Sequence, residues 1–311
     1  MMPLQHNLSL NQQERSILRT LLYFDIFQYP LSESEILRFS PTALNADWTA
    51  SLASLCDQKI VFHIEEFYCL NQNSLLAARR MEGNLLAGKK LITARKFVYW
   101  MSLLPFVRSI MLSGSISKGY MDPNSDIDYF IITSAGRLWI VRTAMALFRR
   151  VFLFNSHKYF CTNYFIDEAN TEITEKNIFT AVETTTLKPM FGKSLIHQFQ
   201  LSNQWCLQFL PNCHTQNDPS EDPKNFLKRL GEKMLPSSWW DALDVWLMKK
   251  SIAYWESRYH PLLDDHDFSI AFQSTRQVSR SHPEFYQKKV LLQYEEKINA
   301  FEIQHGVSLQ V

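Results

Sequence analysis

The chain has 311 residues, 46% of them hydrophobic and 14% aromatic, and its formal net charge is +1. This composition excludes a largely disordered chain, and the balanced charge excludes a strongly basic nucleic-acid-binding surface spread over the whole protein. The length allows two or three domains with a substantial core. Since no apolar run reaches the length of a membrane span and residues 1–10 lack a signal-peptide pattern, we expect a cytoplasmic protein without membrane partners.

Residues 1–72 carry the pattern of three helices followed by a β-hairpin. Asn11, with Glu14 three residues later, has the pattern of a capping box at the start of the first helix, and Pro30 ends that helix. Three helices and a hairpin in this order resemble a winged helix. The remaining elements of this region are expected at 33–39 and 47–57 for the helices, and at 60–64 and 67–70 for the strands.

The winged-helix-like pattern suggests DNA binding, but its charges do not support that function. The helix at 47–57, which would contact the DNA bases, contains no lysine or arginine, and the expected hairpin tip carries Glu65 and Glu66. Contacts to DNA phosphates need cations. We therefore favour a packing or protein-interaction module over a DNA-binding module, because a fold alone does not determine a function.

Residues 73–212 are expected to form a small α/β domain preceded by a long helix at about 73–102. A mixed sheet with helices packed on one side is the expected architecture. The strands are expected at 107–113, 126–133 and 158–166, and the helices at 116–121, 137–152, 175–185 and 192–210.

Residues 213–311 are expected to be helical. A polar, proline-containing loop at 212–223 comes first, and helices follow at about 224–234, 237–258 and 283–304. The predicted fold class is therefore α+β, with an N-terminal winged-helix-like module (1–72), a small mixed-sheet core with its leading helix (73–212) and a C-terminal helical region (213–311).

The most informative motif lies between the first two strands of the expected sheet. Gly114-Ser115 follows one apolar strand, and after ten residues Asp126-Ile-Asp128 opens the next. On a strand the two aspartates point to one face. Two neighbouring carboxylates repel each other unless a cation lies between them. Carboxylates of this kind suit Mg²⁺ or Mn²⁺, which bind a few carboxylates together with substrate phosphates.

A purely structural interpretation of this motif is an exposed turn. Proline, asparagine, aspartate and serine are all common in turns, and they fill residues 122–126. Asp128, however, lies within the apolar run Ile127 to Ile132, where an unpaired carboxylate is costly. We therefore favour the functional interpretation.

The motif resembles the signature of the polymerase-beta-like nucleotidyltransferases, which is an apolar strand, Gly-Ser, a spacer and Asp-x-Asp in a second strand. The resemblance covers residues 111–132 closely and extends to about residue 200. The local form Gly114-Ser-x-x-Lys118-Gly is most similar to the compact, antibiotic-transferase-like branch. The resemblance implies transfer of a nucleoside monophosphate from a nucleoside triphosphate to a hydroxyl group on a small-molecule or protein acceptor, with release of pyrophosphate.

The resemblance also implies roles for individual residues. Asp126 and Asp128 would hold Mg²⁺ or Mn²⁺ and so act as the catalytic pair. Ser115 and Lys118 would bind the phosphates, and Ser117 would either join them or be an exposed helix residue. The glycine at 114 would allow close approach of the backbone.

The chain departs from the family in the expected strand at 158–166. Many members carry a third carboxylate there, whereas this chain has Asn163, and Asp167 lies on the same strand face near the end. Either Asp167 reaches the metal, or Asn163 contacts the metal or substrate, or the site is weakened; a core asparagine bonded to the backbone is a further alternative for Asn163. A weakened site would make the chain a nucleotide-sensing regulator or interaction protein.

Overall fold

The computed structural model describes residues 9–213, 226–234, 236–259, 274–280 and 286–311. The N-terminal elements confirm the predicted order of helices and strands. Asn11 and Glu14 form the predicted capping box, since each side chain accepts a hydrogen bond from the other residue's backbone N–H at 2.9 Å. The elements are α1 (Gln12–Asp25), α2 (Glu33–Phe39), α3 (Trp48–Asp57), the antiparallel pair β1 (Phe62–Ile64) and β2 (Phe67–Cys69), and α4 (Ser74–Ser102).

A mixed five-stranded sheet lies at the centre of the remaining chain, in the order β6-β3-β4-β5-β7. Among the described strands, β4 and β5 run parallel and the other neighbouring pairs of this sheet are antiparallel. The three predicted strands correspond to the middle of this sheet, whereas both edge strands lie outside the predicted ones. The strand bounds are β3 (Val107–Ser113), β4 (Asp128–Thr133), β5 (Cys161–Asp167), β6 (Lys188–Phe191) and β7 (Val278–Arg280).

The helices of this region follow the predicted order, with two differences. The helix expected at 116–121 is a single turn that begins at Gly114, and the helix expected at 192–210 is split into an α-helix and a 3-10 helix. The bounds are α5 (Gly114–Ser117), α6 (Leu138–Phe152), α7 (Ile178–Thr186), α8 (Lys193–Ser202), η1 (Gln204–Gln208), α9 (Phe226–Lys233), α10 (Ser237–Tyr259) and α12 (Tyr286–His305). Beyond Cys213, the predicted loop lies outside the described residues.

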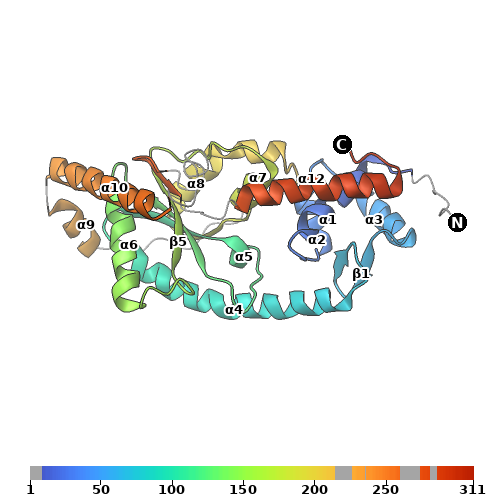
Figure 1. Ribbon diagram of the computed structural model, residues 1–311, viewed down its shortest axis with the longest axis horizontal. Coiled ribbons are helices and arrows are strands. Elements are labelled where there is room, and N and C mark those ends of the chain that lie inside the picture. Colours follow the sequence, from blue (N-terminus) through green and yellow to red (C-terminus); the bar gives the residue numbers. More distant parts are fainter. Residues whose placement is uncertain (1–8, 214–225, 235, 260–273, 281–285) are drawn as a thin grey trace.

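Helices cover both faces of the sheet, so the prediction of helices on one side is wrong. On one face, which we call the Phe130 face, Phe130, Ile132 and Ile166 pack with the N-terminal helices, α7, α8 and α12. On the opposite face, Ile131 and Phe165 pack with α4, α6 and α10. The apolar runs of β4 and β5 therefore have the composition expected of strands that are buried on both sides. Figure 1 shows α4 along one long side of the molecule, from the N-terminal helices to α6.

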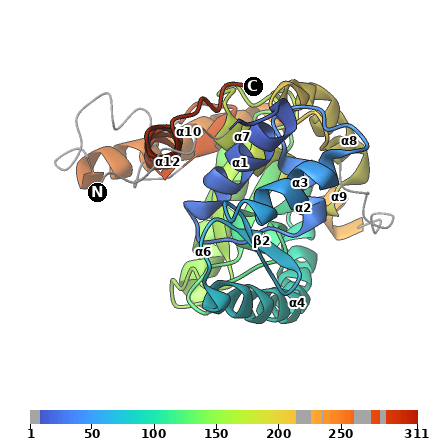
Figure 2. The ribbon, with the colours of Figure 1, turned by 90° about the vertical axis from the view of Figure 1, so that its right-hand side faces the viewer.

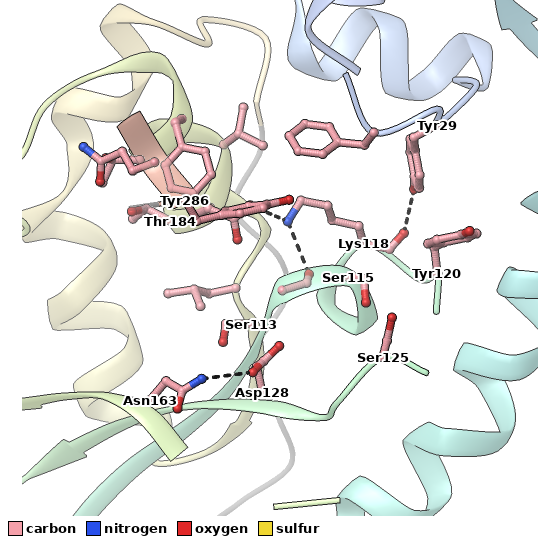
Figure 3. A pocket seen from close by; sticks show the side chains of 18 of the residues that line it. Tyr29, Ser113, Ser115, Lys118, Tyr120, Ser125, Asp128, Asn163, Thr184 and Tyr286 are labelled. Carbon is pink, nitrogen blue, oxygen red and sulfur yellow. Dashed lines mark hydrogen bonds and ion pairs between the residues drawn. The ribbon is translucent and has the colours of Figure 1, made fainter. Parts of the chain in front are cut away.

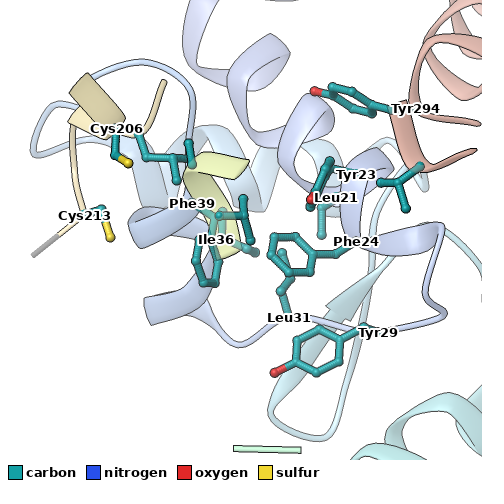
Figure 4. Packing of buried hydrophobic residues seen from close by; sticks show 14 of the residues in the cluster. Leu21, Tyr23, Phe24, Tyr29, Leu31, Ile36, Phe39, Cys206, Cys213 and Tyr294 are labelled. Carbon is teal, nitrogen blue, oxygen red and sulfur yellow. The ribbon is translucent and has the colours of Figure 1, made fainter. Parts of the chain in front are cut away.

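The N-terminal helices share a core with the rest of the chain. Tyr23 on α1 packs edge-on against Tyr294 on α12, with ring centroids 5.3 Å apart, and Phe24 packs against Phe39 at 4.8 Å. Figure 4 shows these rings in one continuous cluster that reaches Cys206. Figure 2 looks onto α1, α2 and α3, which lie above α4.

A buried ion pair attaches the N-terminal helices to α4. The Arg80 side chain is 5% exposed, and its guanidinium group donates to Glu35 Oε1 at 2.8 Å and to the Pro30 carbonyl at 2.8 Å. The same group lies 3.7 Å from the centre of the Tyr29 ring. Removing one partner of such a pair would leave a buried charge unpaired, so this contact fixes α2 on α4. Within the described part of the chain, no helix is both long and apolar enough to cross a membrane.

Candidate functional site

A cavity of about 960 Å³ opens on the Phe130 face of the sheet. Its walls come from the end of α1, from α4, from the turn after β3, from β4 and β5, and from α7 and the start of α12. The structure brings most of the predicted site residues together here (Figure 3). The predicted residues that line the cavity are Gly114, Ser115, Lys118, Asp126, Asp128 and Asn163. Ser117 and Asp167 do not line it.

Gly114 allows the turn after β3 to lie against Asp128. In the sheet register Ser113 pairs with Asp128, so the glycine is the next residue beyond the carboxylate. Its φ is +66°, a conformation that disfavours other residues. A Cβ atom at this position would lie 2.6 Å from Asp128 Oδ2. Both the backbone conformation and the close approach therefore require glycine.

The two serines of the turn have different surroundings. Ser115 faces the cavity. Ser117 is 5% exposed, and its hydroxyl donates to the Gly114 carbonyl at 2.7 Å. Ser117 was expected either to bind phosphate or to be an exposed helix residue, and both expectations are wrong. Its side chain is buried and bonded to the backbone of the same turn.

Lys118 reaches across the cavity to α7. Its ammonium group lies 2.8 Å from Glu183 Oε1 and 3.2 Å from the Gly114 carbonyl oxygen. Its own carbonyl lies 3.1 Å from the Tyr29 hydroxyl, which donates to it (Figure 3). The Lys118 ammonium group is thus held beside the turn by Glu183 of a distant helix. The backbone of Lys118 is held separately by Tyr29 of the N-terminal region.

Asp128 has an unusual electrostatic environment. Burial raises its pKa to about 7, and the charges of Asp126 and Glu183 act in the same direction. A hydrogen bond with Cys161 and the charge of Lys118 oppose the shift. Asp126 and Asp128 both line the cavity, although β4 begins at Asp128, so Asp126 lies just before the strand that was expected to hold both aspartates. Their mutual repulsion is the condition that a bound cation would relieve.

A β-bulge turns Asn163 towards Asp128. Tyr129 pairs with Thr162 and Phe130 pairs with Tyr164, so Asn163 is the extra residue between them. Its amide nitrogen lies 3.5 Å from Asp128 Oδ1 and 3.0 Å from the sulfur of Cys161. Bulges of this kind redirect side chains and are common beside active sites. Asn163 therefore belongs to the cavity, as its central position in the strand suggested.

The interpretation of Asp167 as a third metal ligand beside Asp126 and Asp128 is wrong. The register pairs it with Thr133, at the end of β4 opposite to Asp128, which places it roughly 16 Å along the strand at 3.3 Å per residue. Its carboxylate is buried and accepts hydrogen bonds from the backbone N–H groups of Gly136 and Ala169. The bulge at Asn163 also breaks the alternation that was expected to put both residues on one face.

Glu183 is a cavity residue that the sequence patterns did not reveal. It lies on α7, whose other residues are apolar or threonine, and it is paired with Lys118. Its being the one charged residue of α7 is a weak signal that could have identified it. Its contact with the turn depends on tertiary packing between segments 65 residues apart, which no local pattern encodes.

The residues present fit a divalent cation that is shared with a substrate. Among the described residues, no group of three or more histidine, cysteine, aspartate and glutamate side chains is arranged to hold a metal ion. Mg²⁺ often takes only one or two carboxylates and completes its shell with water and phosphate oxygens. Asp126 and Asp128 supply two carboxylates at the cavity wall. Burial, together with the charges of Asp126 and Glu183, raises the pKa of Asp128, and a bound cation would lower it again.

Comparisons with known proteins give no relatives. No protein-family model matches the chain, and neither a curated protein nor a solved structure matches it.

Proposed function

We propose that the protein is a metal-dependent nucleotidyltransferase that moves a nucleoside monophosphate from a nucleoside triphosphate to a hydroxyl acceptor. One observation carries the proposal: Asp126, Asp128, the Gly114-Ser115 turn and Lys118 all line one cavity. The volume of about 960 Å³ lies within the range of small-molecule sites. The same residues carry the resemblance to the polymerase-beta-like nucleotidyltransferases, whose α/β core the mixed sheet would represent.

In this proposal each residue either compensates the charge of the phosphates or positions the substrate. Asp126 and Asp128 hold the Mg²⁺ or Mn²⁺, which when bound neutralises phosphate charge and lowers the pKa of the attacking hydroxyl. Ser115 donates a hydrogen bond to the phosphates, and Lys118 contributes a point charge to them. The acceptor oxygen forms a bond to the α-phosphorus, the bond from that phosphorus to the bridging oxygen breaks, and pyrophosphate leaves. The acceptor proton passes to a carboxylate or to water.

Lys118 would change partners when the triphosphate binds. In the structure its ammonium group is 2.8 Å from Glu183. A triphosphate on Ser115 would compete with Glu183 for that charge. We therefore propose that Glu183 holds Lys118 near the turn until substrate arrives, and that it weakens substrate binding slightly in doing so.

The winged-helix-like region would serve as a wall of the cavity and not as a DNA reader. Tyr29 contacts the turn through the Lys118 carbonyl, and Arg79 of the adjoining helix α4 pairs with Asp122 in the loop before Asp126. The exposed residues of α3 are Thr49, Ala50, Ala53 and Asp57. No cation among them could contact DNA phosphates.

A second candidate is a nucleotide sensor without turnover. It is favoured by Asn163, which lies against Asp128 on the strand where many members of the resembled family carry an acid. Both candidates predict metal-dependent nucleotide binding, but only the nucleotidyltransferase is expected to release pyrophosphate.

A nucleotide screen tests the proposal. The full chain would be incubated with each of the four ribonucleoside triphosphates and with Mg²⁺ or Mn²⁺, while thermal shift and pyrophosphate release are recorded together. We expect a metal-dependent thermal shift accompanied by pyrophosphate release, both lost in Asp126→Asn. A shift without release favours the sensor. No shift with any triphosphate and either metal contradicts both candidates.

A further inference from the structure

An aromatic corner of the cavity lies beyond the residues used above. Its three rings come from distant segments: Phe27 follows α1, Phe179 is on α7, and Tyr286 is the first residue of α12. The Tyr286 ring centroid is 6.5 Å from that of Phe27 and 6.0 Å from that of Phe179. Tyr286 is nevertheless 49% exposed. The corner therefore presents aromatic surface to the cavity.

We propose that this aromatic corner binds the base of the nucleotide. The inference rests on the proposed function and extends it, because it assigns the two ends of the substrate to two ends of the cavity. Stacking on aromatic side chains suits every nucleobase, since each has a flat π-face. A site that binds only the phosphates and a metal does not require exposed aromatic rings in the same cavity.

The position of the corner relative to Lys118 supports the assignment. Phe179 and Glu183 are four residues apart on α7, so they lie on one side of the helix about one turn from each other. Glu183 contacts the ammonium group of Lys118. The aromatic corner thus begins about one helical turn, about 5 Å, from the proposed phosphate contact, close enough for one nucleotide to reach both. Figure 3 shows Tyr286 on the Lys118 side of the cavity, away from Ser125.

A polar group beside the rings matches the edge of a base. The carbonyl oxygen of the Gln287 side chain accepts a hydrogen bond from Arg280 at 2.9 Å, which directs its amide N–H groups elsewhere. Those N–H groups suit the carbonyl oxygens and ring nitrogens of a base edge. Arg280 is itself paired with Glu175 at 2.6 Å, so its charge is already engaged by a carboxylate. The corner therefore combines apolar faces with a neutral donor, which suits a base better than a phosphate.

Comparing nucleotides with inorganic tripolyphosphate tests this inference. Tripolyphosphate carries the phosphates without a base, so calorimetry of both ligands with Mg²⁺ and the full chain separates the two ends. We expect the best of the four nucleoside triphosphates to bind at least tenfold tighter than tripolyphosphate. Tyr286→Ala should weaken the nucleotide about tenfold and leave tripolyphosphate unchanged, while Tyr286→Phe should retain most of the affinity. Phe179→Leu offers a second, milder test of the same surface.

The control is Tyr159→Ala, which removes a half-exposed tyrosine outside the cavity and should change neither affinity. Equal binding of nucleotide and tripolyphosphate, with no effect of Tyr286→Ala, would overturn the base site while leaving the phosphate site intact. Unchanged nucleotide affinity in Tyr286→Ala, even where the nucleotide binds tighter than tripolyphosphate, would also overturn it. Failure of both ligands to bind would instead reject the proposed function.

Discussion

The two ends of the parallel β4–β5 pair each carry a buried or half-buried aspartate, and the two acids differ in what surrounds them. Burial raises the pKa of both Asp128 and Asp167. Backbone N–H groups of Gly136 and Ala169 donate to Asp167 and lower its pKa again. Asp128 instead faces the like charges of Asp126 and Glu183, which a hydrogen bond with Cys161 and the charge of Lys118 offset only in part. An acid satisfied by the backbone stabilises a fold, whereas an acid that remains electrostatically unsatisfied in a cavity is a candidate for function.

The first and largest expected effect is a gain of stability when the unsatisfied acid is removed. Without metal, the folded-state pKa of Asp128 is about 7, above the ordinary value of about 4. Between these values the unfolded chain ionises while the folded chain keeps its proton, so stability falls as pH rises and levels off above 7. Asp128→Asn removes this loss, and we expect its free energy of unfolding to exceed that of the wild type by about 2–4 kcal/mol at pH 8.

Urea unfolding in EDTA at pH 4 and pH 8 measures this difference. The gain should be present at pH 8 and vanish at pH 4. Asp57→Asn, at the exposed end of α3, serves as the control and should show no comparable gain at either pH. An Asp128→Asn variant that is less stable than the wild type at pH 8 would show that the carboxylate is satisfied in the fold.

The satisfied acid should behave in the opposite way. Asp167→Ala leaves the backbone N–H groups of Gly136 and Ala169 without their acceptor, so we expect a loss of about 2–3 kcal/mol in the free energy of unfolding. Glu168→Ala, at the neighbouring half-exposed position, should lose less than about 1 kcal/mol. Urea unfolding measures both variants, and equal losses would contradict the structural role assigned to Asp167.

Glycine substitutions sharpen the comparison at the Asp128 end. Gly114→Ala and Gly119→Ala both place a side chain at positive φ, so each should lose about 1–2 kcal/mol of stability. Only the Cβ of residue 114 would collide with the Asp128 carboxylate; residue 119 has open space around it. Calorimetry should therefore find Mg²⁺–nucleotide affinity lowered about tenfold in Gly114→Ala alone. Equal affinities of the two variants would remove the argument for Gly114.

The smallest effect is expected at Glu183. Glu183→Gln frees Lys118 from its partner, and removing a partly exposed ion pair changes the free energy by about 0.5–1 kcal/mol. We expect Mg²⁺–tripolyphosphate to bind about two- to fivefold tighter. Glu172→Gln breaks the surface pair with Lys176 and should leave the affinity unchanged. Weaker binding in Glu183→Gln would mean that this carboxylate holds the cation and does not compete for Lys118.

The sequence predicts the elements that depend on local patterns. The capping box at Asn11 and the bounds of β3 follow from neighbouring residues and are confirmed. Asp126 and Asp128 were expected to share a strand face; both line the cavity, although β4 begins only at Asp128. The edge strands β6 and β7 could not be predicted in this way, because each is only three or four residues long and is defined by its pairing with the sheet.

The site was predicted in part for the same reason. The turn and the aspartate pair are contiguous in sequence, whereas Glu183 joins them through a helix 65 residues away from Lys118. The bulge at Asn163 is set by how β5 pairs with β4, and strict alternation cannot anticipate an extra residue. Asp167 was assigned wrongly for two reasons: the bulge at Asn163 changes the face on which it lies, and it lies at the end of the strands opposite to Asp128.

The central claim is that the acids beside the Gly114-Ser115 turn bind a metal–triphosphate and that the acid at the far end of the strands does not. Calorimetric titration of Mg²⁺–tripolyphosphate at pH 8 into the wild type, Asp128→Asn and Asp167→Asn tests this directly. We expect Asp128→Asn to lower the affinity at least a hundredfold and Asp167→Asn to leave it within about twofold, with both variants folded. Unchanged affinity in Asp128→Asn, or an equal loss in Asp167→Asn, would contradict the account.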